Sequence, residues 1–173
     1  MTVYTLALPV GLPMMNANHR LHFAKRAGQT KEIRDAAADT ARSAGVPALP
    51  GAWVMGYVHP PKNYAVWDPA NYHPMAKAAL DGLVDAGVFT DDSYQFVAGP
   101  DMRPAPKVPG GQLVLVVMPD AWRCRCGHDV IEHLEGGVLE RCRRPVCGCL
   151  RYREPDPTPG NPAGGVSAPG GGV

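Results

Sequence analysis

Alternation of apolar and polar side chains predicts four short strands before residue 120. The stretches are residues 2–8, 52–59, 94–101 and 112–118. Residues 112–118, QLVLVVM, give the clearest pattern of the four. In residues 52–59 the side chains of Trp53, Met55 and Tyr57 share one side of the strand, and the pattern leaves open which side faces the core.

A helical period predicts two helices between these strands. The first is expected from Thr30 to about Ala44, with a face of small side chains that would let it approach a sheet closely. The second is expected from about Pro74, which a first turn tolerates, to Gly87, which suits a left-handed stop. The order β-α-β-α-β-β predicts an α/β or α+β domain over residues 1–121, with a small mixed sheet and two helices packed on it.

Charged residues surround the second helix and indicate where chemistry could occur. They are Asp68 and Asn71 in the turn before it, Lys77, Asp81 and Asp85 on one polar stripe of it, and Asp91 and Asp92 after it. Carboxylates gathered with a lysine and an asparagine suit Mg²⁺, which prefers oxygen ligands and keeps waters that a phosphate can displace. The alternative is an N-capped surface helix whose charges are only solvated.

The segment DPANYHPMAKAALDGLVDAGVFTDD resembles the signature of the RusA family of crossover junction (Holliday junction) endodeoxyribonucleases, especially its phage-type members. That signature has an acidic D-x-D-N turn, a lysine early in a helix, an aspartate within the helix and a DD pair. This chain departs from it twice: Ala70 stands at the second turn aspartate, and extra residues separate Asn71 from Lys77. The resemblance covers about residues 2–118.

The resemblance implies an endonuclease that uses Mg²⁺ or Mn²⁺, acts as a homodimer on branched DNA, and serves recombination, repair or phage DNA processing. The implied metal-binding carboxylates are Asp68 and Asp92 as the main pair, Asp91 as a helper or alternative, and Asp81. Lys77 would stabilise charge on the scissile phosphate or leaving oxygen, and Asn71 would orient the turn or contact a ligand. Because Ala70 replaces an acid, a protein that binds junctions without cutting them is the alternative. No small-molecule cofactor is expected.

The loop predicted for residues 9–28 carries side chains suited to DNA phosphates. Its expected DNA-binding residues are Asn16, Asn18, Arg20, Lys25 and Arg26, on a stretch that also resembles the N-terminal pattern of the RusA family. The alternative is a solvated loop. The formal net charge of the chain is +1, so DNA binding has to depend on local patches.

Targeting signals are not apparent in the sequence. No stretch approaches the roughly 20 apolar residues of a membrane span, and prolines interrupt the short apolar start MTVYTLALPVGLP. We therefore expect a protein without a membrane partner, located in the cytoplasm of a bacterium or of a phage-infected host cell.

All five cysteines lie in residues 122–153, which predict a small zinc-ribbon-like module. The candidate ligands are Cys124, Cys126, His128, His133, Cys142, Cys147 and Cys149. One structural Zn²⁺ would take four of them, with Cys126, His133, Cys142 and either Cys147 or Cys149 favoured, and a two-zinc site using all seven stays open. Metal would supply the folding energy that so small a segment lacks, and the alternative is a reduced, metal-free segment.

Two further predictions concern the C-terminal part of the chain. Residues 154–173 are rich in proline and glycine and predict a disordered tail. A further functional alternative makes residues 122–153 the active part, as a DNA-binding or protein-binding module carried on an inert domain.

Overall fold

The computed structural model describes residues 2–64, 66–119, 134–135 and 138–139. The elements up to residue 119 are β1 (Tyr4–Ala7), α1 (Phe23–Ser43), β2 (Ala52–His59), the 3-10 helix η1 (Pro69–Tyr72), α2 (His73–Asp85), β3 (Val97–Pro104) and β4 (Gln112–Met118). The predicted order β-α-β-α-β-β is confirmed, with η1 as an addition before α2. Residues Thr2–Trp122 belong to one compact unit of the chain.

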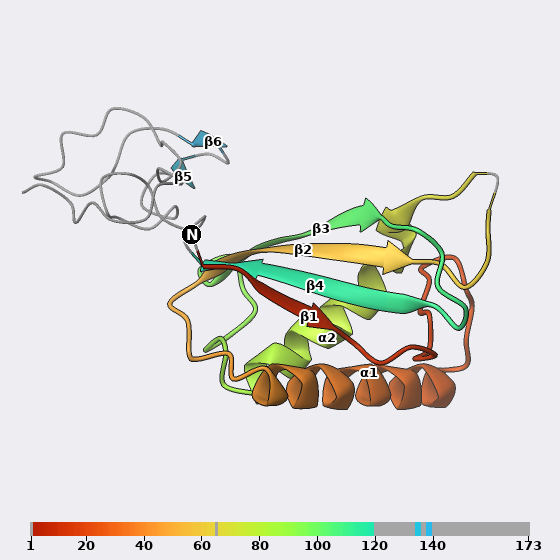
Figure 1. Cartoon of the computed structure of the whole chain (residues 1–173), viewed down its shortest axis with the longest axis horizontal. Coiled ribbons are helices and arrows are strands. Elements are labelled where there is room, and N and C mark those ends of the chain that lie inside the picture. The colour runs from red at the N-terminus through yellow and green to blue at the C-terminus, as the bar shows by residue number, and fades with distance from the viewer. Residues whose placement is uncertain (1, 65, 120–133, 136–137, 140–173) are drawn as a thin grey trace, which may run out of the picture. The chain divides into compact units, whose positions relative to one another are not determined.

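The four strands form one mixed sheet in the order β1-β4-β2-β3 (Figure 1). β4 is antiparallel to both β1 and β2, and β3 is parallel to β2. The predicted small mixed sheet with two helices is therefore confirmed. α2 crosses behind the sheet and α1 runs beside β1 (Figure 1), so within the described residues the two helices leave the other face of the sheet uncovered.

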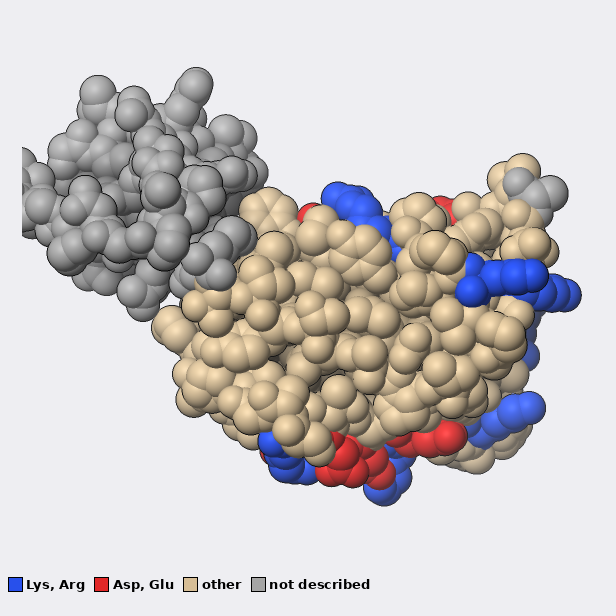
Figure 2. Space-filling model, in the orientation of Figure 1, with Lys and Arg blue, Asp and Glu red and all other residues tan. Residues whose placement is uncertain are grey.

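The strand pattern has a clear buried side. In β2 the side chains of Val54 and Val58 are fully buried, whereas Trp53, Met55 and Tyr57 are only half-buried. The sequence pattern left open which side of this strand faces the core. In the structure Trp53, Met55 and Tyr57 lie on the side that faces away from the two helices. The middle of the face shown in Figure 2 is formed by uncharged residues.

α2 follows the sequence prediction closely. Pro74 lies in its first turn, where a missing N–H costs no intrahelical hydrogen bond. The chain leaves the helix through Gly87, whose φ of 77° lies in the left-handed region that favours glycine. One side of the helix is buried in the core, including Met75, Ala76 and Leu83.

The predicted start of the first helix at Thr30 is wrong, because α1 begins seven residues earlier at Phe23. The side chain of His22 accepts the backbone N–H of Ala24 and caps the helix. Residues 24–29 are mostly good helix formers, and a single glycine among them, Gly28, lowers helix stability without ending the helix. Lys25 and Arg26 therefore lie on the first turn of α1 and not on a flexible loop.

The third strand was also misplaced: it spans Val97–Pro104 and not residues 94–101. The backbone carbonyl of Ser93 accepts hydrogen bonds from the N–H groups of Phe96 and Val97, so the chain turns there before it extends. β3 lies at the edge of the sheet, where a proline such as Pro104 is tolerated because its missing N–H need not pair.

The small side chains of α1 pack against α2, although the sequence suggested contact with the sheet. A Cβ atom built on Gly82 of α2 would lie 2.3 Å from the backbone oxygen of Arg34 and 2.9 Å from the Cβ of Ala37. Arg34 of α1 also donates from Nη2 to Oδ1 of Asp85 at 2.6 Å, and Arg42 donates to the carbonyl of Asp85 at 2.9 Å. Close backbone contact and two arginines thus join the helices.

Beyond residue 119 the structure describes only a short hairpin. β5 (Leu134–Glu135) pairs antiparallel with β6 (Val138–Leu139). The predicted zinc ligands Cys124, Cys126, His128, His133, Cys142, Cys147 and Cys149 and the tail 154–173 lie outside the described residues. The zinc module and the disordered tail stay predictions.

The contact at Gly82 can be tested by substitution. We expect Gly82→Ala to lower the free energy of unfolding by about 1–3 kcal/mol, because the added methyl group meets backbone atoms that cannot move aside cheaply. Urea unfolding followed by circular dichroism measures the change. The matched control is Gly28→Ala in α1, where nothing lies within 4 Å of the added Cβ, and we expect a gain of about 0.5–1 kcal/mol there. Equal effects of the two substitutions would contradict the packing described.

Candidate active site around Lys77

Lys77, Asp81 and Asp92 form the closest charged cluster of the predicted site residues. The ammonium of Lys77 donates to Oδ1 of Asp81 at 2.6 Å, one helical turn along α2, and to Oδ2 of Asp92, which follows the helix. The i, i+4 spacing on α2 places Lys77 and Asp81 on one side of the helix. The lysine therefore joins the helix to the acidic turn between α2 and β3.

The cluster is partly open to solvent, and its charges are stabilised by each other. The side chains of Lys77, Asp81 and Asp92 are 50%, 28% and 19% exposed. Partial burial acts to lower the pKa of Lys77, but hydrogen bonds with Asp81 and Asp92 outweigh it and raise that pKa. The hydrogen bond from Lys77 lowers the pKa of Asp92. Lys77 and Asp92 are consequently both ionised at neutral pH.

Asp91 orients the turn that carries Asp92. Its Oδ1 accepts the backbone N–H of Asp92 at 2.9 Å, and its side chain is exposed. The two neighbouring aspartates therefore have different surroundings: Asp92 binds the lysine, and Asp91 stabilises the backbone next to it.

Asp68 and Asn71 lie at η1, before α2. Asp68 is the N-cap of η1, and its Oδ1 accepts the N–H of Ala70 at 2.8 Å. The carbonyl of Asn71 accepts the N–H of Ala17 at 2.7 Å, which fastens the N-terminal loop to this turn. Within residues 2–119 as described, no side-chain hydrogen bond or ion pair joins Asp68 or Asn71 to the Lys77 cluster.

The structure brings together some of the predicted metal-binding carboxylates. Asp81 and Asp92 meet at Lys77, and Asp91 is next to Asp92 in the chain. Among the described residues, however, no three His, Cys, Asp or Glu side chains lie close enough together to hold a metal ion. The four predicted carboxylates are therefore not gathered into one set around a single point.

The predicted DNA-binding residues lie on the loop before α1 and on its first turn. Asn16 accepts the N–H of Asn18 at 2.9 Å, and Asn16, His19 and Arg26 line a small hollow together with Pro74 of α2. Arg20 and Lys25 are exposed. The structure therefore places this basic stretch beside the start of α2, near the turn that carries Asp68.

Several contributors to this region were not apparent from the sequence. Asp85 was expected on a polar stripe of the helix with Lys77 and Asp81, but Arg34 pairs with it and lowers its pKa, so it serves the helix contact. Tyr72 is buried beneath the turn, and burial raises its pKa. The hydrogen bond between Ala17 and Asn71 joins residues far apart in sequence, and no local pattern signals it.

No family model matches the chain, and no curated protein matches it either. The resemblance to the RusA family thus depends on the quoted residues alone. In the part of the chain that the structure describes, none of the helices is long and apolar enough to cross a membrane.

Because Asp92 forms an ion pair with Lys77, we expect its contribution to the free energy of unfolding to depend on pH. Its folded-state pKa lies below the ordinary value of 3.8, so the contribution is complete above that pH and is lost as pH falls through the folded pKa. We expect Asp92→Asn to cost about 1 kcal/mol or less at about pH 7, and the deficit to shrink at about pH 3. Urea unfolding at the two pH values measures it.

The control for this experiment is Asp91→Asn, because an asparagine oxygen can still accept the N–H of residue 92. We expect this variant to match the wild type at both pH values. A deficit of Asp92→Asn that is independent of pH would show that the ion pair with Lys77 is not its source.

Proposed function

We propose that this protein is a Mg²⁺-dependent endonuclease that cuts four-way or otherwise branched DNA. The observation that carries the proposal is the cluster of Lys77, Asp81 and Asp92, which joins an ammonium to two carboxylates on a partly exposed surface. The residues of this cluster match the lysine, helix aspartate and DD pair of the RusA signature. The corresponding biological role is recombination, repair or phage DNA processing in the cytoplasm.

The ligand type of these carboxylates suits a hard divalent cation, although among the described residues no three of them converge on one point. Carboxylate oxygens are the ligands that Mg²⁺ takes, and a lowered pKa keeps Asp92 ionised. Asp92 and Asp68 would be the main ligands, with Asp91 and Asp81 as further donors. When bound, the ion polarises a phosphoryl oxygen and lowers the pKa of a water molecule.

The protein's own groups would position and stabilise the DNA. Lys77 supplies a fixed positive charge beside the carboxylates, where it can balance charge that develops on the scissile phosphate or leaving oxygen. The basic stretch with Arg20, Lys25 and Arg26 neutralises phosphates of the bound strands. A homodimer, which the resemblance implies, would present two such sites to the two strands of a junction. Zn²⁺ would stabilise residues 122–153.

Cleavage of a synthetic four-way junction tests the proposal. We expect the full-length protein to nick the junction with Mg²⁺ or Mn²⁺, and Asp92→Asn to lower the rate about 100-fold or more, because it removes a charge at the reacting centre. Product formation is followed on denaturing gels with end-labelled strands.

The matched control is Asp39→Asn, which makes the same change of charge at an aspartate 78% exposed on α1 and paired with Arg42. We expect it to cut at the wild-type rate. Absence of cleavage by the wild type with any divalent metal, or full cleavage by Asp92→Asn, would refute the endonuclease assignment.

A second candidate function is junction binding without cleavage. Two observations favour it: Ala70 stands where the family signature has an aspartate, and in the described residues no three metal-binding side chains converge. In this case the basic stretch and the turn beside it would bind branched DNA, and the carboxylates would hold only Lys77.

Restoring the missing acid separates the two functions. Ala70 is exposed, so Ala70→Asp can be made without disturbing the core. If the protein binds without cutting, we expect the wild type to shift the junction on native gels with no product, and Ala70→Asp to gain Mg²⁺-dependent cleavage. Ala70→Asn, of similar size but uncharged, is the control and should not gain it. Cleavage by the wild type would exclude this candidate.

A further inference from the structure

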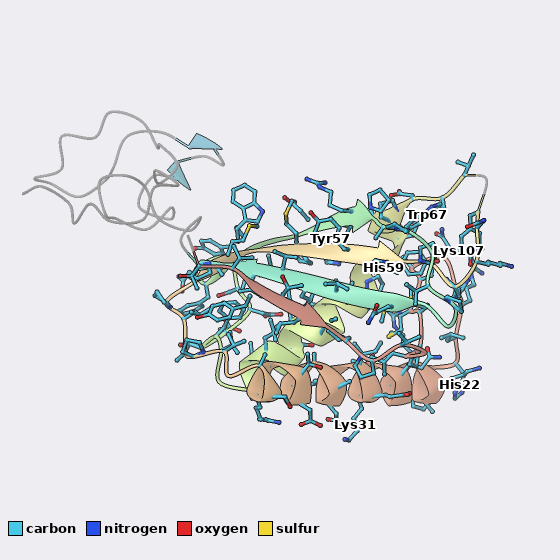
Figure 3. All side chains as sticks on the ribbon, viewed as in Figure 1. His22, Lys31, Tyr57, His59, Trp67 and Lys107 are labelled. Atoms are coloured by element: carbon cyan, nitrogen blue, oxygen red, sulfur yellow. The ribbon has the colours of Figure 1, made fainter. Side chains whose placement is uncertain are left out.

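Three loops meet at one end of the sheet and are held together by backbone hydrogen bonds. They are residues 8–22 before α1, residues 60–64 and 66–67 after β2, and residues 105–111 between β3 and β4. The N–H of Val108 donates to the carbonyl of Pro60 at 3.0 Å, and the N–H of Gly11 donates to the carbonyl of Gly111 at 3.0 Å. His22, His59, Trp67 and Lys107 all lie at this end in Figure 3.

This end carries positive charge that the described chain does not neutralise. Its cations are Arg20, Lys25 and Arg26 around the start of α1, Lys62 in the second loop and Lys107 in the third. The three loops contain no Asp or Glu, and among the described residues none of the five cations forms an ion pair. Lys and Arg side chains gather at this end (right in Figure 2).

Aromatic rings are exposed among these cations. Phe23, the first residue of α1, is 78% exposed, and the centre of its ring lies 4.6 Å from the centre of the His22 ring. Tyr64 is 37% exposed, and the ammonium of Lys62 lies 5.5 Å from its ring centre. A single exposed apolar residue needs no explanation in itself, but exposed aromatic rings on a surface that also carries cations are a combination that single-stranded nucleic acid binds.

The surface next to Phe23 is open and shallow. Phe23 and Arg26 line one end of an open groove of about 740 Å³ along α1. Farther along the groove, Lys31 and Arg34 are already paired with Asp35 and Asp85, so free positive charge remains at the Phe23 end. No acidic residue lies in the first turn of α1. Charge and shape thus favour phosphate and base beside Phe23.

We propose that Phe23 stacks on an unpaired base of bound DNA while Lys25, Arg26 and Arg20 contact the phosphates beside it. The partner is a single-stranded or unstacked segment, which a branch point provides and a continuous duplex does not. Stacking on a ring is tolerant of sequence, so Phe23 would recognise structure and not a base sequence. This inference deepens the proposed function, since it assigns a residue that selects branched over linear DNA.

Binding of the full-length protein to labelled oligothymidylate tests the inference by fluorescence anisotropy. We expect Phe23→Leu to weaken binding about 5- to 150-fold, because one stacked base is lost. The dependence of affinity on salt should keep its slope, because no charge is removed. Phe23→Trp should bind as tightly as the wild type, because it keeps an aromatic face.

Two controls separate stacking from general effects. Val3→Ala shortens an apolar side chain that is 47% exposed and lies outside the three loops, and we expect no change in binding. Binding of a matched linear duplex should change little in Phe23→Leu. Failure of the wild type to bind oligothymidylate, unchanged binding by Phe23→Leu, or an equal loss on the duplex would overturn the inference.

The outcome is distinguishable from that of the nuclease test. Junction cleavage by the wild type with no effect of Phe23→Leu on binding would remove the stacking role alone. Loss of oligothymidylate binding in Phe23→Leu, in a protein that never cuts junctions, would support the stacking role and remove the nuclease.

Discussion

The arrangement of the whole unit depends on the close contact of α1 with α2 at Gly82. Any side chain larger than the hydrogen atom of glycine is too close there, because a Cβ atom would lie 2.3 Å from the carbonyl oxygen of Arg34. Gly82 lies about 140° around the helix from Lys77, given about 100° per residue. Packing the Gly82 side against α1 therefore turns Lys77 and Asp81 away from the helix contact and towards solvent, where they can meet Asp92.

The acidic residues of α2 and of the turn after it pair with two different sets of cations. Arg34 and Arg42 of α1 hold Asp85 at the C-terminal end of the helix, and that contact is structural. Lys77 holds Asp81 and Asp92. Asp85 therefore serves the contact between the helices, whereas Asp81 and Asp92 meet at Lys77 beside the exposed Asp91. The stripe of charges that looks uniform in the sequence is thus divided by tertiary contacts.

Local patterns predicted β2, β4 and α2 well, because alternation, proline and a left-handed glycine act within a few residues. They failed at the start of α1, where Gly28 suggested a loop although the surrounding residues favour a helix. They failed again at β3, whose bounds depend on parallel pairing with β2, a contact distant in sequence. The spacing of four residues predicts Lys77 and Asp81 as neighbours, but the approach of Asp92 to them could be expected only from the family signature. Phe23 could not be found from sequence, since its exposure depends on the helix start that was missed.

The residues between Asn71 and Lys77 determine how the acidic turn is held. They continue the chain through η1 into the first turn of α2, so that Asp68 precedes the lysine cluster by a 3-10 helix and an α-helical turn. One carboxylate oxygen of Asp68 caps η1. The backbone hydrogen bond between Ala17 and Asn71 links the turn to the N-terminal loop. The turn therefore takes its position from two sources, α2 on one side and the loop that carries the basic residues on the other.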